Sequence, residues 1–214
     1  MGNPVNSIAI GVRVGHSPDP AFFVQWTQML CKAMRPDDMV LPPAVHLPHA
    51  IAANYLTEAF LKTECDALLF VDDDMMFQPQ DVTTLRDSMG DYAVMGGLYP
   101  TRRYPFAPVC FNRTATGVDT VKKIHGITPC DIVGLGFTLV HRRHLFIDCF
   151  EWHNRYGEDG LMCERIKKDG GKIAVNADVR IGHRVTSAVY WEPDTNSVRC
   201  EFNTFGIGKK QAGN

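Results

Sequence analysis

Three consecutive aspartates, Asp72, Asp73 and Asp74, follow a wholly apolar run at residues 67–71. Such a run is typical of a central strand covered on both faces, and ligands of open α/β sheets bind outside the carboxyl ends of the strands. Adjacent carboxylates repel one another, and a divalent cation relieves that repulsion. Oxygen ligands favour Mg²⁺ or Mn²⁺. The motif favours a metal site in which Asp72 and Asp74 bind one ion, with Asp73 turned away or bonded to local backbone; the alternative is an acidic surface turn that caps the next helix.

A second group of polar residues lies between positions 157 and 183. Glu158 and Asp159 begin a predicted helix, where an acid also favours the helix dipole. The strand that follows this helix leads to His183. A single histidine is more often structural, but an imidazole at a second strand end can complete an oxygen-rich Mn²⁺ site. Together with the aspartates, His183 is therefore interpreted as a metal ligand.

Two further segments point to a ligand near the backbone. Gly134, Leu135 and Gly136 interrupt an apolar stretch, which predicts either a plain β-bulge or backbone brought close to a ligand. Arg102 and Arg103 follow another predicted strand. Guanidinium groups there can neutralise phosphate; the alternative is a solvated basic loop.

The elements that position these residues alternate along the chain. Apolar runs predict strands over residues 7–14, 67–71, 92–98, 131–133, 137–140 and 172–179, and 3.6-residue spacing predicts helices over 19–34, 51–62, 79–89 and 158–168. This alternation predicts an α/β fold with a mostly parallel central sheet. Residues 99–129 are expected to be irregular, with at most one hairpin, and the last thirty residues show no clean period.

The composition is that of an ordinary globular protein. The chain of 214 residues is 45% hydrophobic and 21% charged, with a formal net charge of −2, so bulk attraction to nucleic acid or to a membrane surface is not expected. Its seven cysteines include no pair at CxxC spacing. We find no signal peptide and no run near the ~20 apolar residues of a spanning helix. These features predict a cytoplasmic protein with reduced thiols.

Read in order, four segments resemble nucleotide-sugar glycosyltransferases of the GT-A fold, most closely small family-2-like members of bacterial and phage type. The segments are LLFVDDDM, GGLYPTRR, DIVGLGFTLVHRR, and GEDGLMCERIKKDGGKI with the later Gly-His. The resemblance covers about residues 5–185. It implies a single GT-A (Rossmann-like) domain over 1–185, with residues 186–214 as a tail or lid of the same domain.

The resemblance also implies roles for particular residues. Asp72, Asp74 and His183 match metal ligands for Mn²⁺ or Mg²⁺, and Asp159, beside Glu158, matches the catalytic base of inverting members. Inverting transfer is accordingly favoured over retaining. Two sets of residues are expected to line the substrates: Val14, His16, Asn54, Asp73 and Arg102 for the nucleotide-sugar donor, and Gly134, Leu135 and Gly136 for the sugar and acceptor pocket.

The sequence leaves several alternatives open. A nucleotidyltransferase also needs an acidic metal site on an α/β sheet, although residues 14–17 lack the lysine usual in its glycine-rich loop. A non-catalytic nucleotide-sugar-binding module would keep the pocket without turnover. The acceptor is open among a glycan, a lipid-linked sugar, a small molecule and a nucleic-acid base. The oligomeric state is open as well.

Overall fold

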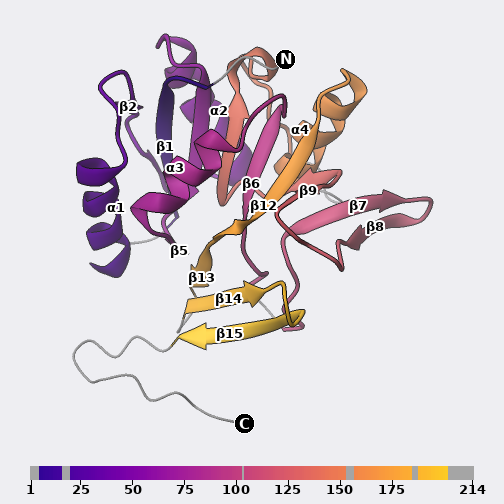
Figure 1. Ribbon diagram of the computed structural model, residues 1–214. Coiled ribbons are helices and arrows are strands. Elements are labelled where there is room, and N and C mark those ends of the chain that lie inside the picture. The colour runs from indigo at the N-terminus through magenta and orange to yellow at the C-terminus, as the bar shows by residue number, and fades with distance from the viewer. Residues whose placement is uncertain (1–4, 16–19, 103, 153–156, 185–187, 202–214) are drawn as a thin grey trace.

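The computed structural model describes residues 5–15, 20–102, 104–152, 157–184 and 188–201 (Figure 1). Its helices are α1 (Pro20–Lys32), α2 (His49–Leu61), α3 (Pro79–Asp87) and α4 (Gly157–Lys168), with a 3₁₀ turn at Arg142–His144. All four helices lie where the sequence predicts them. Pro79 occupies the first turn of α3, where its missing N–H is tolerated.

The central sheet contains eight strands. They are β1 (Ile8–Val14), β2 (Met39–Val40), β3 (Ala44–Val45), β4 (Ala67–Asp72), β6 (Val94–Leu98), β9 (Ile127–Pro129), β11 (Phe137–His141) and β12 (Ile173–Arg180). The order across the sheet is β2-β1-β4-β11-β6-β12-β9, and β3 pairs with β1. Most pairings are parallel, as the alternation predicts; β11 runs antiparallel to both its neighbours, and β9 runs antiparallel to β12.

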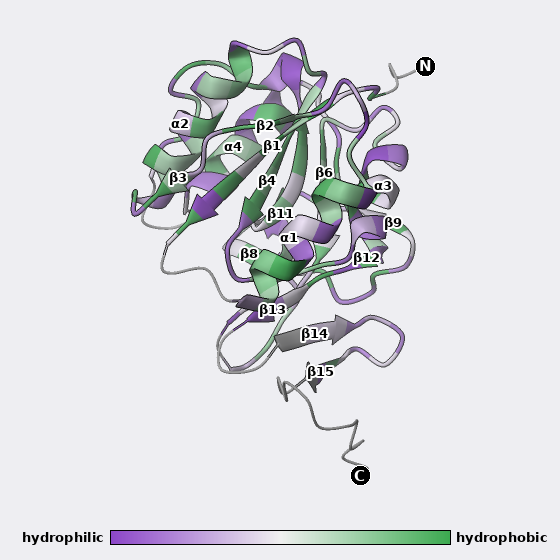
Figure 2. Cartoon of the chain, turned by 90° about the vertical axis from the view of Figure 1, so that its left-hand side faces the viewer, coloured by the Kyte–Doolittle hydropathy of each residue, from purple (hydrophilic) through white to green (hydrophobic). Residues whose placement is uncertain are grey.

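Two hydrophobic cores cover the two faces of this sheet. Successive residues of β4 alternate between them: Leu68 and Phe70 pack with α2 and α4, whereas Leu69 and Val71 pack with α1 and α3. Figure 2 shows the resulting apolar strands between the helices. Because both faces are covered, the run at 67–71 is uninterrupted by polar residues. The first polar side chain of this strand, that of Asp72, comes at its carboxyl end.

Two smaller sheets carry the segments that the sequence did not predict well. One consists of β7 (Cys110–Thr114), β8 (Gly117–Thr120) and β10 (Ile132–Val133). The other joins β5 (Met75–Met76), β13 (Gly182–Arg184), β14 (Ala188–Glu192) and β15 (Ser197–Glu201). The strand halves predicted on either side of residues 134–136 therefore belong to different sheets, since β10 pairs with β7 and β11 pairs with β4 and β6.

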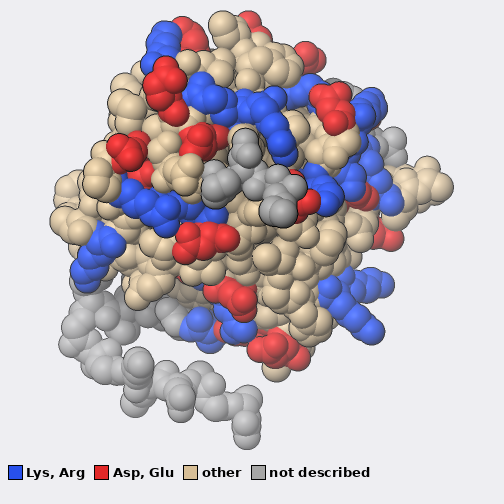
Figure 3. All heavy atoms as spheres, turned by 45° about the horizontal axis from the view of Figure 1, so that its top comes forward, with Lys and Arg blue, Asp and Glu red and all other residues tan. Residues whose placement is uncertain are grey.

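The surface bears both signs of charge. Figure 3 shows Lys and Arg interspersed with Asp and Glu over the face seen there. No helix among the described residues is both long enough and apolar enough to span a bilayer.

Candidate functional site

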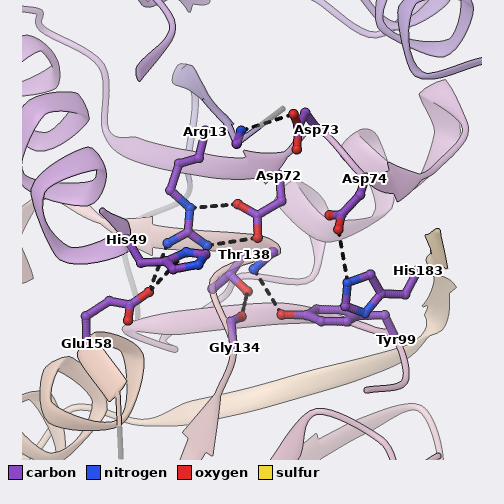
Figure 4. A network of polar contacts seen from close by, with 12 residues as sticks. Arg13, His49, Asp72, Asp73, Asp74, Tyr99, Gly134, Thr138, Glu158 and His183 are labelled. Atoms are coloured by element: carbon purple, nitrogen blue, oxygen red, sulfur yellow. Dashed lines mark hydrogen bonds and ion pairs between the residues drawn. The ribbon is translucent and has the colours of Figure 1, made fainter. Parts of the chain in front are cut away.

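The site forms where several strands end. β1 ends at Val14 and β4 ends at Asp72, and the two strands are parallel neighbours. β5 follows β4 after two residues and pairs with β13, which carries His183 opposite Met75. The fold therefore brings the aspartate motif and His183 together, as Figure 4 shows.

Asp74, His183 and Arg102 form a cluster at this edge, which we call the Asp74 cluster. His183 Nε2 lies 3.3 Å from Asp74 Oδ2. Arg102 Nε lies 2.8 Å from the same imidazole nitrogen, and its Nη2 contacts Asp74 Oδ2. The Arg102 side chain is 54% exposed, whereas that of Asp74 is 16% exposed. The arginine thus approaches a carboxylate and an imidazole from the solvent side.

The His183 ring is held in the tautomer that a metal ligand needs. Its Nδ1 lies 2.7 Å from the carbonyl oxygen of Pro100, so that Nδ1 carries the hydrogen. Nε2 keeps its lone pair, which accepts the Nε–H of Arg102 beside Asp74. Ligand imidazoles commonly bond a backbone carbonyl through their other nitrogen in this way. Burial, together with the Arg102 charge, lowers the pKa of His183 below its ordinary value. The ring is therefore neutral at neutral pH.

One oxygen of Asp74 is buried and unsatisfied. Among the described residues, Asp74 Oδ1 has no hydrogen-bond partner. A buried carboxylate oxygen without a partner is costly and calls for an explanation. Within the described part of the chain, no three His, Cys, Asp or Glu side chains form a complete metal-binding group. Asp74 and His183 fit a Mg²⁺ or Mn²⁺ site whose remaining ligands come from a substrate, which is how such ions are usually held.

Asp72 belongs to a different and more buried cluster. Arg13 Nε donates to Asp72 Oδ1 at 2.7 Å, and Nη2 donates to Oδ2 at 3.0 Å. Nη1 of the same arginine donates to Glu158 Oε1 at 3.1 Å. We call these three residues the Arg13 cluster. Burial opposes the charge of Arg13, but the ion pairs with Asp72 and Glu158 outweigh it and raise its pKa above the ordinary value.

The remaining donor-side residues lie around the end of β1. Asp73 accepts a hydrogen bond from the backbone N–H of Gly15 at 3.1 Å, the local backbone contact expected for it. Val14 is half-buried and accepts a backbone bond from His46 through its carbonyl. His16 lies outside the described residues. Asp73 therefore connects the aspartate motif to the end of β1, where Val14 lies.

Asp159 lies on the other side of the site, in the first turn of α4. Burial, and next the charge of Glu158, raise the pKa of Asp159 to about 7. Its Oδ1 accepts from the N–H of Gly160 at 2.7 Å. A Cβ added to Gly134 would lie 3.5 Å from its Oδ2, so Asp159 faces the glycine segment that follows β10.

The glycine segment is tightly packed. The N–H of Gly136 donates to the Tyr99 hydroxyl at 2.9 Å, and a Cβ at either Gly134 or Gly136 would collide with that hydroxyl. Burial, with the charge of Asp72, raises the pKa of Tyr99 above its ordinary value, so it stays a neutral phenol. Leu135 is 2% exposed and packs in the hydrophobic core, so its side chain does not line an open pocket, contrary to expectation.

Asn54 was expected to contact the nucleotide-sugar donor, but in the structure its side chain bonds the backbone of Phe150. Its side-chain amide donates to the carbonyl of Phe150 at 2.8 Å and accepts from the N–H of Phe150 at 2.9 Å. Both ends of the amide are thus engaged by one residue of the loop before α4. No local sequence pattern indicates this pairing, because the two residues are 96 positions apart.

Sequence reasoning missed one residue that the structure places in the site, Arg13. Arg13 is the charged residue in an otherwise apolar strand of the pattern IAIGVRV. A charge in a strand covered on both faces needs a partner, and that rule was the available signal. Tyr99, whose ring the sequence makes a candidate for stacking on a base or a sugar, directly follows β6 and is 4% exposed.

Known structures share this architecture. A197 from STIV aligns over 96% of this chain and 99% of its own, with a TM-score of 0.67 and 17% sequence identity. GalNAc-T7, solved with UDP, GalNAc and Mn²⁺, aligns over 85% of this chain with a TM-score of 0.52 and 12% identity. This alignment spans 44% of the GalNAc-T7 chain. No protein-family model and no curated protein matches the sequence. At these identities the likeness concerns the fold.

Proposed function

We propose that this chain, which has the GT-A-like fold of nucleotide-sugar transferases, transfers a sugar from a nucleoside-diphosphate sugar to an acceptor hydroxyl with the help of Mn²⁺ or Mg²⁺. One observation carries the proposal: His183 Nε2 lies 3.3 Å from Asp74 at the carboxyl edge of the sheet, and one Asp74 oxygen is unsatisfied among the described residues. Ligands of open α/β sheets bind at that edge.

On the donor side, Asp74 and His183 hold the ion, and Asp72 and Asp73 complete the acidic surroundings. An ion held by these residues would supply positive charge against the negative charge of the leaving diphosphate. Arg102 is the donor-binding arginine, because its exposed guanidinium already lies at Asp74 and can turn to a phosphate oxygen. Val14, at the end of β1, and His16 belong to the expected nucleotide side.

On the acceptor side, Asp159 accepts the proton of the attacking hydroxyl. A base works best when its pKa lies near the working pH, and that of Asp159 is raised to about 7. Glu158 contributes through its charge, the second cause of this shift. The backbone of Gly134 and Gly136 forms the floor between Asp159 and Tyr99. Direct attack of the acceptor with this base corresponds to inversion.

The C-terminal hairpin belongs to the same proposed unit. β14 pairs with β13, so that His183 lies opposite Val189. We assign residues 1–185 to the transferase domain and 186–214 to a segment that extends it beside the metal ligand. A lid role for that segment is consistent with this placement, since closure over a donor excludes water.

A thermal-shift screen of nucleotide sugars tests the proposal. The melting temperature should rise with at least one nucleotide sugar in Mn²⁺ and should not rise in EDTA, because a ligand that binds only the folded state stabilises it. Nucleoside triphosphates, screened alongside, test the nucleotidyltransferase alternative. A shift with triphosphates alone would contradict sugar transfer. A shift without any sugar release in the presence of acceptors would indicate a binding module.

A further inference from the structure

Arg13 is the most buried charged residue of the site. It is 7% exposed and lies one residue before the end of β1. In the register of the parallel pair β1–β4 it stands directly opposite Asp72. The two side chains therefore lie on the same face of the sheet, which makes the two-pronged contact possible.

The guanidinium bonds two carboxylates that come from distant parts of the chain. Two of its nitrogens donate hydrogen bonds to the two oxygens of Asp72. The third donates to Glu158, which is 145 residues away in sequence. Figure 4 shows Arg13 between them. A planar fork of this kind fixes the directions of its partners, whereas an ammonium group acts as a point charge.

Each of the two carboxylates bonded to Arg13 is close in sequence to a residue with a role in the proposed reaction. Asp72 is two residues from Asp74, and Glu158 is the neighbour of Asp159 in the first turn of α4. In the described part of the chain Glu158 makes one further ion-pair contact, with His49, whose Nδ1 lies 3.9 Å away and whose side chain is 65% exposed. Arg13 is thus a buried, charged connection between the donor side and the acceptor side, in addition to the backbone of the glycine segment, where the Asp72 N–H donates to the Gly136 carbonyl.

We propose that Arg13 is a positioning residue that couples these two sides. By holding Asp72 and Glu158 in one rigid fork, it sets the place of Asp159 relative to the metal-bound donor. This inference rests on the proposed function, because it assigns donor and acceptor to the two sides. A misplacement of about 1 Å in such a site can cost on the order of 100-fold in rate.

Hydrogen exchange with Arg13→Lys tests the coupling. The variant keeps the charge, so it should fold, but a single ammonium group cannot reproduce the fork. In the wild type, Mn²⁺ with UDP or GDP should protect the amides of the α4 start, residues 157–161, as well as those of residues 71–77. In Arg13→Lys the protection at 71–77 should remain, and that at 157–161 should be lost.

Arg142→Lys is the matched control. Arg142 also makes several bonds, to the carbonyls of Cys65 and Thr63 at 2.6 Å, but it lies at the other end of β4. Its replacement should loosen residues 60–66 and leave the ligand-induced protection of the α4 start intact. A purely structural Arg13 predicts equal behaviour of the two variants, and that result would overturn the proposal.

The experiment distinguishes failure of this proposal from failure of the proposed function. If neither UDP nor GDP with Mn²⁺ protects residues 71–77 in the wild type, donor binding at the Asp74 cluster is contradicted. In that case, hydrogen exchange without any ligand tests whether Arg13 couples the two segments. Faster exchange at both 71–77 and 157–161 in Arg13→Lys, but not in Arg142→Lys, supports the coupling, and unchanged exchange at 157–161 overturns it.

Discussion

The Arg13 cluster and the Asp74 cluster contain aspartates only two residues apart on the chain, Asp72 and Asp74, but the two clusters differ in how their charges are matched. In the Arg13 cluster both oxygens of Asp72 are bonded by a buried arginine. In the Asp74 cluster one oxygen has no partner among the described residues, and the cation beside it is largely exposed. A satisfied buried network gives rigidity, whereas an incomplete one indicates a place for a ligand.

The difference teaches that adjacent aspartates of one motif can have separate tasks. Asp72 ties strands and helix together, Asp73 bonds the backbone at Gly15, and Asp74 faces the imidazole of His183. The sequence prediction treated Asp72 and Asp74 as equal ligands of one ion. In the structure Asp72 is held by Arg13, whereas Asp74 lies beside His183.

The largest expected effect belongs to Asp159→Asn. Loss of the base should lower kcat by roughly 10²–10⁴-fold, while binding of UDP or GDP with Mn²⁺ stays within about threefold, since the change lies in the chemical step. Steady-state kinetics with parallel calorimetry measure both. Glu164→Gln, farther along the same helix, is the control and should leave kcat unchanged. Near wild-type turnover of Asp159→Asn would place the base elsewhere.

The pH dependence of turnover should follow Asp159. Because its pKa is raised to about 7, the carboxylate that accepts protons is present above that pH and is lost below it. We therefore expect kcat to fall about tenfold per pH unit below pH 7 and to level off above it. A profile of kcat from pH 5 to 9 measures this. A flat profile down to pH 5 would exclude Asp159 as the titrating base.

His183→Ala should weaken metal binding without unfolding the chain. We expect the Mn²⁺ half-saturation of diphosphate binding to rise at least about 10-fold, the lower end of the cost of losing even an outer-shell partner. A Mn²⁺ titration beside a melting curve measures the two effects separately. His144→Ala, in the 3₁₀ turn at the other end of the sheet, is the control. A lower melting temperature with an unchanged Mn²⁺ requirement would make His183 purely structural.

Arg102→Met should produce the smallest effects: the affinity for Mn²⁺ should rise and the affinity for UDP or GDP should fall. Without diphosphate, Mn²⁺ should bind the variant more tightly, because the guanidinium no longer pairs with Asp74. With Mn²⁺ present, UDP or GDP should bind more weakly by about 3–10-fold, a modest loss because Arg102 is exposed. Electron paramagnetic resonance of Mn²⁺ and calorimetry measure the two affinities. Changes of the same sign in both assays would contradict the two contacts assigned to Arg102.

Much of the fold follows from the sequence because local patterns determine it. The four helices and the strands through 67–71 and 92–98 have clear periods and lie where they are predicted. The strands of the two smaller sheets are short and pair across long distances, as β5 does with β13. Pairings of this kind are set by tertiary contacts, which no local period reports. The C-terminal hairpin was missed for the same reason.

The residues of the candidate site likewise divide into those that are evident from the sequence and those that only the structure reveals. Asp72, Asp74, Asp159 and His183 stand at element ends and carry side chains whose chemistry is evident from the sequence. Arg13 supports two of the site's elements through contacts 59 and 145 residues away, and Leu135 and Asn54 have packing roles that residue type alone does not reveal. Ligand-like residues are therefore predictable, whereas the residues that position them require the structure.

Calorimetry of UDP and GDP binding to the wild-type chain tests the central claim most directly. The account predicts that at least one of the two binds in Mn²⁺, that EDTA abolishes binding, and that Asp74→Asn reproduces the effect of EDTA. Equal affinity in Mn²⁺ and EDTA, or unchanged Mn²⁺ dependence in Asp74→Asn, would contradict a metal-dependent donor site at Asp74 and His183.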